Sequence, residues 1–206
     1  MKPISEICNE IYKRIASHHI RPLAGKNLFV ISSMYNGLWL EHVYDAVLFA
    51  TMDSANLPLA KDTIEVFIEH QKDGQYPFRI AEIDGVLSVE YSQVQECVSF
   101  LSLALKVSEM LSDPAFDEKV YESGKKWISW LETYRMTRKT GLSEMFVGFD
   151  TGHDFSGRLE GLSCIKKQFL PSGEAAPASL LPPNDNVAPI LAVDMSCNFF
   201  GNLVAL

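Results

Sequence analysis

Apolar residues recur along this chain with the 3.6-residue period of an α-helix, in six segments of two alternating kinds. The first kind is amphipathic, with apolar residues on one helical face and charged residues opposite, and covers residues 4–15, 57–71 and 115–134. The second kind is apolar on nearly all sides and covers residues 38–52, 92–111 and 194–206. A helix of the first kind is half exposed in a folded protein, whereas a helix of the second kind is buried. The pattern therefore predicts an outer helix followed by an inner helix, three times in succession.

This order of segments predicts an all-α fold of about three antiparallel helical hairpins, in a single domain that covers residues 1–206. Strand signals are few: residues 27–32 and 85–89 each fit either a short strand or an extended loop. The connection from Arg135 to Val193 is long for a compact domain. Its Pro-rich part, at about 166–190, is expected to form an excursion from that domain.

The inner segment 38–52 carries polar residues that a buried helix normally avoids, namely Glu41, His42 and Asp45. In an array of antiparallel hairpins, every connection from an outer helix to an inner helix lies at the same end. Polar side chains near these connections should therefore meet at the N-terminal ends of the inner helices, where the helix dipoles are positive. The pattern predicts a functional site at this end. The alternative is that Glu41 and Asp45 only cap neighbouring helices.

The last outer-to-inner connection contains the densest group of functional side chains, in residues 148–158. Asp150, His153, Asp154 and Arg158 lie within this stretch, and three glycines between them disfavour a regular helix or strand. Two interpretations remain open. The stretch is either a loop that holds acids and bases for a site, or a Gly-rich turn whose aspartates cap backbone amides. Asp150 in particular either orients this loop or binds a hydroxyl group.

The side chains near the three connections suit a carbohydrate ligand. Aromatic rings stack on the apolar faces of a sugar ring, while carboxylates and amides bind its hydroxyl groups. Glycoside hydrolysis also uses a pair of carboxylic acids. Core packing is the commoner role of any single aromatic residue. The aromatic residues in question are Trp39, Tyr44, Tyr76, Phe149 and Phe155.

Composition excludes several other classes of function. The net charge of −8 and the absence of any basic cluster longer than two residues exclude a nucleic-acid surface. No stretch has the length of an uncharged membrane span, and the N-terminus lacks the apolar core of a signal peptide. The four cysteines form no Cys-x-x-Cys pair and the five histidines show no metal-ligand spacing. We therefore expect a cytoplasmic protein with free thiols, no metal site and no cofactor.

Several of these segments resemble the motifs of one family. Residues 152–158 (Gly-His-Asp-Phe-Ser-Gly-Arg) resemble the Gly-Trp-Asp-Phe-Ser-Ser-Arg signature of trehalases, with His153 in place of the tryptophan. Processing α-glucosidase I and bacterial mannosylglycerate hydrolases share this signature in variant form. Glu41 with Tyr44-Asp45 looks like the family's Glu-x-Tyr-x-Trp-Asp segment. Similar matches, in the family's order, are Gln71-x-Asp73-Gly74-x-x-Pro77, Ser92-Gln93 and Val193-Asp194-Met195.

The resemblance implies an (α/α)6 toroid of six hairpins and an inverting glycosidase that acts on an α-glucoside or an α-mannoside. It makes Asp154 the general acid and places Asp45, Gln93 and Arg158 at sugar-binding positions. Inversion further requires a second carboxylate, roughly 6.5 to 9.5 Å away, that activates water. The full set of candidate substrate-binding residues is Trp39, Glu41, Tyr44, Asp45, Gln93, Asp150, His153 and Arg158.

The resemblance also implies that this chain is incomplete as an enzyme, because the family's catalytic base lies in the second half of the toroid. We therefore expect self-association or a second chain that completes the toroid, and an exposed apolar flank along residues 197–206. Two non-catalytic interpretations remain. The chain could be a carbohydrate-binding protein built on the same hairpins, or a helical assembly protein.

Overall fold

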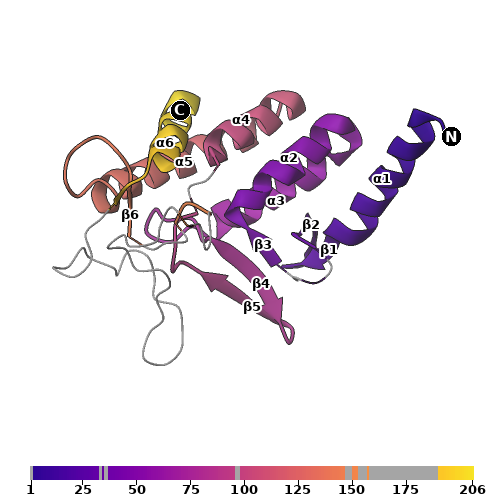
Figure 1. Cartoon of the computed structure of the whole chain (residues 1–206), viewed down its shortest axis with the longest axis horizontal. Coiled ribbons are helices and arrows are strands. Elements are labelled where there is room, and N and C mark those ends of the chain that lie inside the picture. The colour runs from indigo at the N-terminus through magenta and orange to yellow at the C-terminus, as the bar shows by residue number, and fades with distance from the viewer. Residues whose placement is uncertain are drawn as a thin grey trace.

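The computed structural model describes residues 2–32, 34, 37–95, 98–146, 150–152, 157 and 190–206 (Figure 1). Nearly all of the predicted Pro-rich excursion lies outside these residues. The described residues form six α-helices, which are α1 (Ile4–His19), α2 (Val43–Met52), α3 (Leu57–Glu69), α4 (Phe100–Leu111), α5 (Pro114–Tyr134) and α6 (Val193–Ala205). Short 3-10 helices at Leu40–His42 and Ser54–Asn56 precede α2 and α3. Each predicted helical segment thus contains one observed helix.

The connections between helices carry short antiparallel strands, so the prediction of an all-α fold is wrong for these connections. Two tight turns explain two of the pairings, because Ala24-Gly25 and Asp84-Gly85 adopt positive φ and reverse the chain within two residues. Residues 27–32 and 85–89, which fitted either a short strand or an extended loop, overlap strands β2 (Lys26–Phe29) and β5 (Val86–Glu90). The strands are β1 (Ile20–Leu23) with β2 (Lys26–Phe29), β3 (Gly37–Trp39) with β4 (Arg79–Ile83) and β5 (Val86–Glu90), and β6 (Glu144–Met145) with β7 (Ile190–Leu191).

The helices pack in the predicted order of inner and outer elements. Helix α4 contacts α2 on one side and α6 on the other, which makes a row of three inner helices. The outer helix α3 packs against α2 and α4, and the outer helix α5 packs against α4 and α6. Helix α1 lies at the edge of the array and contacts β1.

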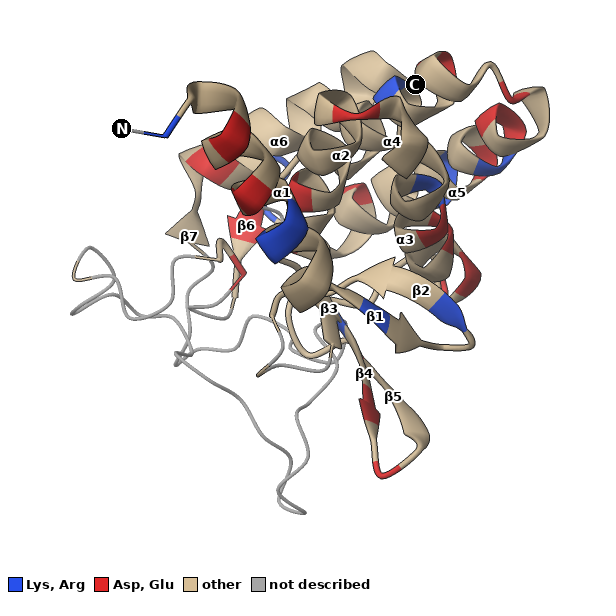
Figure 2. Cartoon of the chain, turned by 90° about the vertical axis from the view of Figure 1, so that its right-hand side faces the viewer, with Lys and Arg blue, Asp and Glu red and all other residues tan. Residues whose placement is uncertain are grey.

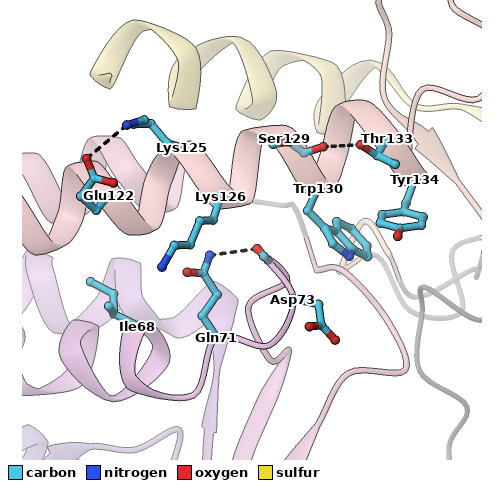
Figure 3. A pocket seen from close by; sticks show the side chains of 11 residues that line it. Ile68, Gln71, Asp73, Glu122, Lys125, Lys126, Ser129, Trp130, Thr133 and Tyr134 are labelled. Atoms are coloured by element: carbon cyan, nitrogen blue, oxygen red, sulfur yellow. Dashed lines mark hydrogen bonds and ion pairs between the residues drawn. The ribbon is translucent and has the colours of Figure 1, made fainter.

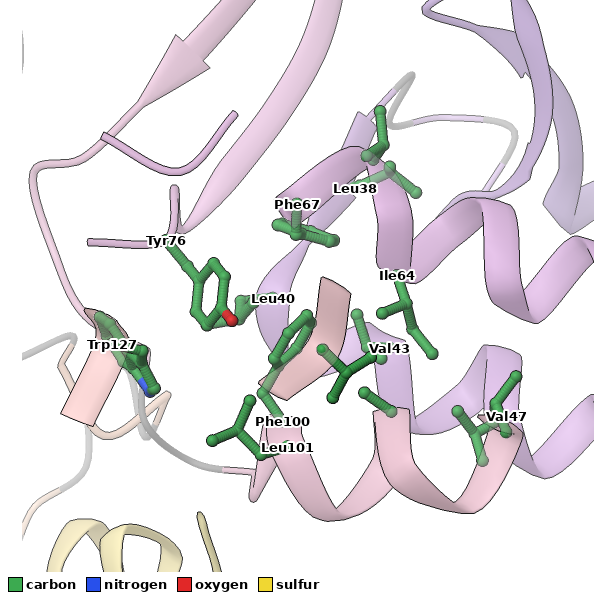
Figure 4. Close-up of a cluster of buried hydrophobic side chains, with 14 of the residues drawn as sticks. Leu38, Leu40, Val43, Val47, Ile64, Phe67, Tyr76, Phe100, Leu101 and Trp127 are labelled. Carbon is green, nitrogen blue, oxygen red and sulfur yellow. The ribbon is translucent and has the colours of Figure 1, made fainter. Parts of the chain in front are cut away.

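A cluster of large aromatic rings fills the space between the inner and outer helices (Figure 4). The Tyr76 ring centroid lies 4.5 Å from that of Phe100 and 5.1 Å from that of Trp127. The Tyr76 hydroxyl, which is fully buried, shares a 2.5 Å hydrogen bond with the Ser123 hydroxyl, and burial raises the pKa of this phenol. Burial of each such side chain contributes about 1.5–3 kcal/mol. This cluster fixes α5 against α4 and the turn before β4.

Burial along the helices departs from the predicted alternation at both edges of the array. Helix α3 is more buried than an outer helix should be, because β2 covers its other face. In α1, every residue of which is described, none is buried, and Ile4 is 80% exposed. The C-terminal part of α1 packs against the core through Tyr12, Ile15 and Ala16, and the Tyr12 ring stacks on Phe49 at 5.0 Å. Helix α6, predicted to be buried, has buried residues only at Met195, Phe199 and Asn202.

Helix α4 begins at Phe100, eight residues after the predicted start at residue 92. Two features prevent an earlier start. Gln95 adopts a φ of 48°, which a helix does not allow. The amide of Val94 donates to a side chain far along the chain, Asp150, rather than to a helical carbonyl. Ser92-Gln93 therefore lie in an extended segment before α4 and not in its first turn.

The described residues carry neither a membrane-crossing helix nor a metal site. No described helix is long and apolar enough to span a bilayer. No group of three or more His, Cys, Asp or Glu side chains among these residues is placed to hold a metal ion. Cys8 and Cys197 are free thiols on the surface. In Figure 2, acidic and basic residues are spread over the same helices, α1 and α5 among them.

Candidate functional site

A three-stranded sheet joins the first two outer-to-inner connections. Strand β3 leads into α2, and its Gly37 and Trp39 pair with Ala81 and Arg79 of β4 in the next connection. Strand β5 pairs with the other edge of β4 and leads toward Ser92-Gln93. The Gln75 side-chain amide also donates to the carbonyl of Tyr91 at 3.0 Å. The segments that carry the first three motifs are thus held at one end of the helix array.

Asp150 fastens the third connection to the second. One carboxylate oxygen accepts a 2.9 Å hydrogen bond from the Val94 amide, and the other accepts a 2.9 Å hydrogen bond from the Phe146 amide. The Arg135 guanidinium lies 3.8 Å from the same carboxylate, and both side chains are fully buried. The start of the 150–158 loop therefore lies beside the residue that follows Gln93. This geometry favours the loop-orienting role of Asp150 over hydroxyl binding, because none of its surface faces solvent.

The pairing of β6 with β7 brings the N-terminus of α6 to the same end. Glu144 pairs with Leu191, and the Ala192 amide donates to the carbonyl of Ser143 at 3.2 Å. Asp194 follows directly in the first turn of α6. The N-terminal ends of α2, α4 and α6 are therefore linked through one set of strands and hydrogen bonds, as the hairpin topology predicts.

Two carboxylates and an imidazole form a cluster at the start of α2. His42 Nδ1 lies 2.7 Å from Asp45 Oδ2, and His42 Nε2 lies 3.3 Å from Glu41 Oε1. Partial burial lowers the pKa of His42, but the hydrogen bonds to Asp45 and Glu41 outweigh this effect and raise the pKa to about 9. His42 is thus an imidazolium at neutral pH. The sequence placed it beside the candidate carboxylates without giving it a role, although its spacing of three residues from Asp45 is the spacing that lets helical side chains meet.

The other candidate residues of this region differ in accessibility. Trp39 is half-buried, and the Arg79 guanidinium lies 4.9 Å from its ring centroid. Tyr44 is 51% exposed on α2. Gln93 is half-buried, and its Oε1 atom is buried without a hydrogen-bond partner among the described residues. Trp39, Tyr44 and Gln93 therefore each present a group at the N-terminal end of the inner helices.

Three candidates lie outside the described residues. They are the candidate general acid Asp154 and the candidate substrate-binding residues His153 and Arg158. Asp150 to Gly152 and Gly157 are the described residues of this loop. The anchoring of Asp150 therefore marks where the loop begins.

Two of the four motif residues in the turn at residues 71–77 hold this turn against α5. Gln71 Nε2 donates to the carbonyls of Gly74 and Ser123 at 2.9 and 3.0 Å. Gly74 has a φ of +96°, and a Cβ atom there would lie 2.7 Å from the Lys126 carbonyl oxygen. The glutamine and glycine of this motif thus have structural roles, whereas Asp73 is exposed.

Comparison with known proteins gives a likeness of fold. No protein-family model matches the sequence, and no curated protein matches it. Among solved structures, the chain is similar to the GH63 mannosylglycerate hydrolase from Thermus thermophilus in complex with glucose, with a TM-score of 0.54 and 16% identity. The match covers 77% of this chain and 42% of that chain. The chain therefore has part of a six-hairpin glycoside hydrolase fold and spans less than half of the hydrolase it matches.

Proposed function

We propose that this chain forms the general-acid side of a glycoside hydrolase centre that acts by inversion on an α-glucoside or an α-mannoside. The observation that supports it is the Asp150 anchor, which bonds a residue four positions before Asp154 to the amide of Val94, the residue that follows Gln93. The same end of the array carries Glu41 and Asp45. The likeness to a GH63 hydrolase adds a fold that is known to carry this type of chemistry.

In this proposal each residue has a distinct chemical task. Asp154 donates a proton to the leaving oxygen, which requires that its carboxyl group stay protonated near neutral pH. Asp45, Gln93 and Arg158 bind sugar hydroxyl groups. Trp39 offers an aromatic ring to the apolar face of the sugar. His42 neutralises part of the negative charge of Glu41 and Asp45 and so holds the two carboxylates in place.

The proposed centre is incomplete within these 206 residues, because the family resemblance places the water-activating base in the other half of the toroid. We propose that a second chain supplies it. The same fold without a base would be a non-catalytic carbohydrate-binding protein. The exposed apolar face of α6, where Phe200 is 66% exposed, favours a further candidate, a helical assembly protein.

Sugar binding by the chain alone is the direct test. We expect glucose, titrated by calorimetry, to bind the wild-type chain and to bind Asp45→Asn about tenfold more weakly, because a charged hydrogen-bond partner is lost. Asp84→Asn, an exposed aspartate in the β4–β5 turn, is the control. Equal affinity of wild type and Asp45→Asn for glucose and for mannose would contradict the assignment of Asp45.

The role of Asp154 is tested in an active form, with the complementary half supplied. We expect Asp154→Asn to lower turnover at least about 10²-fold while sugar affinity changes little, since asparagine keeps the shape but cannot deliver a proton. The substrate should carry a poor leaving group, which needs protonation. Near-normal hydrolysis of that substrate would exclude Asp154 as the acid.

A further inference from the structure

An open groove of about 720 Å³ lies between the turn at Gln71–Gly74 and the C-terminal half of α5 (Figure 3). Its walls come from the two outer helices and this turn, with Ile68 on α3 and Trp130 on α5. None of the candidate substrate-binding residues lines it. The groove is therefore a feature separate from the cluster at the start of α2.

The groove is lined by two acidic and two basic side chains, whose charges sum to zero. Glu122 and Lys125 pair with each other at 3.2 Å. Asp73 and Lys126 form no ion pair and no side-chain hydrogen bond with any described residue, and Figure 3 shows them at different positions along the groove. The groove thus offers one carboxylate and one ammonium group with no net charge. Such a lining suits a neutral ligand with groups that both donate and accept hydrogen bonds, since a charged ligand would meet one attractive and one repulsive group.

Two aromatic residues, Trp130 and Tyr134, line the groove, and Trp127 stacks on Trp130 without lining it. The Trp127 and Trp130 rings stack with an interplanar angle of 7° at 5.4 Å, and the Tyr134 ring lies 5.4 Å from that of Trp130. Both tryptophans are buried, whereas Tyr134 is 43% exposed. The Tyr134 ring thus contacts Trp130 on one side and stays partly accessible. An accessible aromatic ring can stack on the apolar face of a sugar.

The opposite wall is rigid because the turn is locked to α5. Gln71 bonds to both Gly74 and Ser123, and the close approach of Gly74 to the Lys126 carbonyl leaves no space for a side chain. Asp73 is held in this turn with a φ of 52°. A preorganised wall lowers the entropy that binding costs.

We propose that this groove is an accessory site for a neutral oligosaccharide. Asp73 accepts hydrogen bonds from sugar hydroxyl groups, Lys126 donates to them, and Tyr134 stacks on a sugar ring. The volume of about 720 Å³ and the separation of Asp73 from Lys126 along the groove fit several linked sugar units rather than one. The site does not depend on the proposed catalytic centre, because it shares no residue with it.

The chain has three tryptophans, which lets one experiment distinguish the two sites. Trp130 lines the groove, whereas Trp39 lies at the start of α2. We expect titration with maltoheptaose or mannohexaose to shift the indole N–H resonance of Trp130 in ¹⁵N spectra of the wild-type chain. Shifts confined to Trp39 would place binding in the proposed catalytic centre instead and would overturn the groove site. No shift with either oligosaccharide would overturn it too.

Two variants with a matched control complete the test. Asp73→Asn and Tyr134→Ala should each weaken the Trp130 response about tenfold, because a charged hydrogen-bond acceptor or the stacking ring is lost. Asp84→Asn is the control for Asp73→Asn, since both aspartates have a φ of 52° before a glycine. Unchanged affinity in Asp73→Asn, which leaves the fold intact, would overturn the proposal. An equal Trp130 shift with sodium phosphate would overturn the neutral ligand.

Discussion

His42 shows how a single residue at the start of α2 is controlled by its neighbours. The two charged groups that contact it are Glu41 and Asp45, and both lower the free energy of the imidazolium form. Arg79, in β4, lies over Trp39 and pairs with Glu90, so its positive charge is already compensated. The cluster therefore responds to pH mainly through His42.

The pH dependence follows from the pKa of His42 in the folded chain, about 9 against 6.5 when unfolded. The stabilisation by the charged ring is complete below about pH 6.5 and is lost as the pH rises through about 9. We expect the free energy of unfolding to fall by about 1 kcal/mol over this range, a value reduced for the partial exposure of the ring. Urea denaturation at several pH values should show this slope in wild type and not in His42→Gln. His18→Gln, on the exposed face of α1, should keep it; an unchanged slope in His42→Gln would contradict the prediction.

Asp150 joins the third outer-to-inner connection to the second through its hydrogen bonds with the Val94 and Phe146 amides. We expect Asp150→Asn to lower the free energy of unfolding by about 2–4 kcal/mol, because the carboxylate accepts two backbone amides and lies beside a buried guanidinium. Urea denaturation measures the change, with Asp84→Asn as the exposed control. A loss of less than about 1 kcal/mol, within the range of surface substitutions, would show that the anchor contributes little.

Contacts between elements join residues that lie far apart in the chain. Helix α5 runs from Pro114 to Tyr134 and nearly coincides with the predicted segment, because Asp113 caps its N-terminus and Pro114 begins its first turn. The turn at residues 71–77 was expected at the candidate site, yet its glutamine bonds to α5 and its glycine packs closely against α5. A motif can therefore be placed correctly in the chain while its side chains serve a different neighbour.

Alanine variants of Gly74 and Gly85, which each follow an aspartate, distinguish the effect of packing from that of backbone conformation. Gly74→Ala should destabilise the chain by about 2–4 kcal/mol, because its φ of +96° is unfavourable and the new Cβ would lie 2.7 Å from a backbone oxygen. Gly85→Ala should cost only about 1 kcal/mol, since its φ is also positive but its Cβ would meet no described atom within 4 Å. Thermal and urea unfolding of both variants provide the comparison. Equal costs would show that the contact with α5 does not restrict Gly74.

At the scale of the whole molecule, the inner helices at the two ends of the row expose apolar side chains. Phe200 and Val204 on α6 are 66% and 70% exposed, and Leu48 and Met52 on α2 are 47% and 61% exposed. Helix α4, which has a neighbour on each side, exposes fewer such residues. The face of α6 matches the apolar flank that the sequence predicted along residues 197–206, and large apolar surfaces rarely stay uncovered in a soluble protein.

We expect the chain to self-associate through the face of α6. Val204→Lys should shift the population toward monomer in light scattering and sedimentation, because a charge cannot be buried in an apolar interface. Val86→Lys is the matched control, since Val86 is 69% exposed but lies in the β4–β5 hairpin. A wild-type chain that is monomeric at high concentration and that hydrolyses glycosides alone would contradict both the self-association and the missing base.

The amino-acid sequence by itself determined the helices and their order. Periodicity is a local property, so the positions of α2, α3, α5 and α6 could be predicted to within a few residues, apart from the strand and 3-10 turn before α2. The sequence also predicted that the three outer-to-inner connections lie at one end, because this depends only on successive helices running in opposite directions. The resemblance of short motifs led to the six-hairpin fold that the structural comparison supports.

Only the tertiary structure decided which partner each polar side chain meets. Val94 and Asp150 are 56 residues apart, so their hydrogen bond, and the late start of α4 that accompanies it, could not follow from local pattern. The charged state of His42 depends on its exact distances to two carboxylates, and the groove depends on the seating of one turn against α5. Burial likewise depends on which neighbours are present. For this reason the apolar face of α1 and much of the apolar helix α6 remain exposed at the edges of the array.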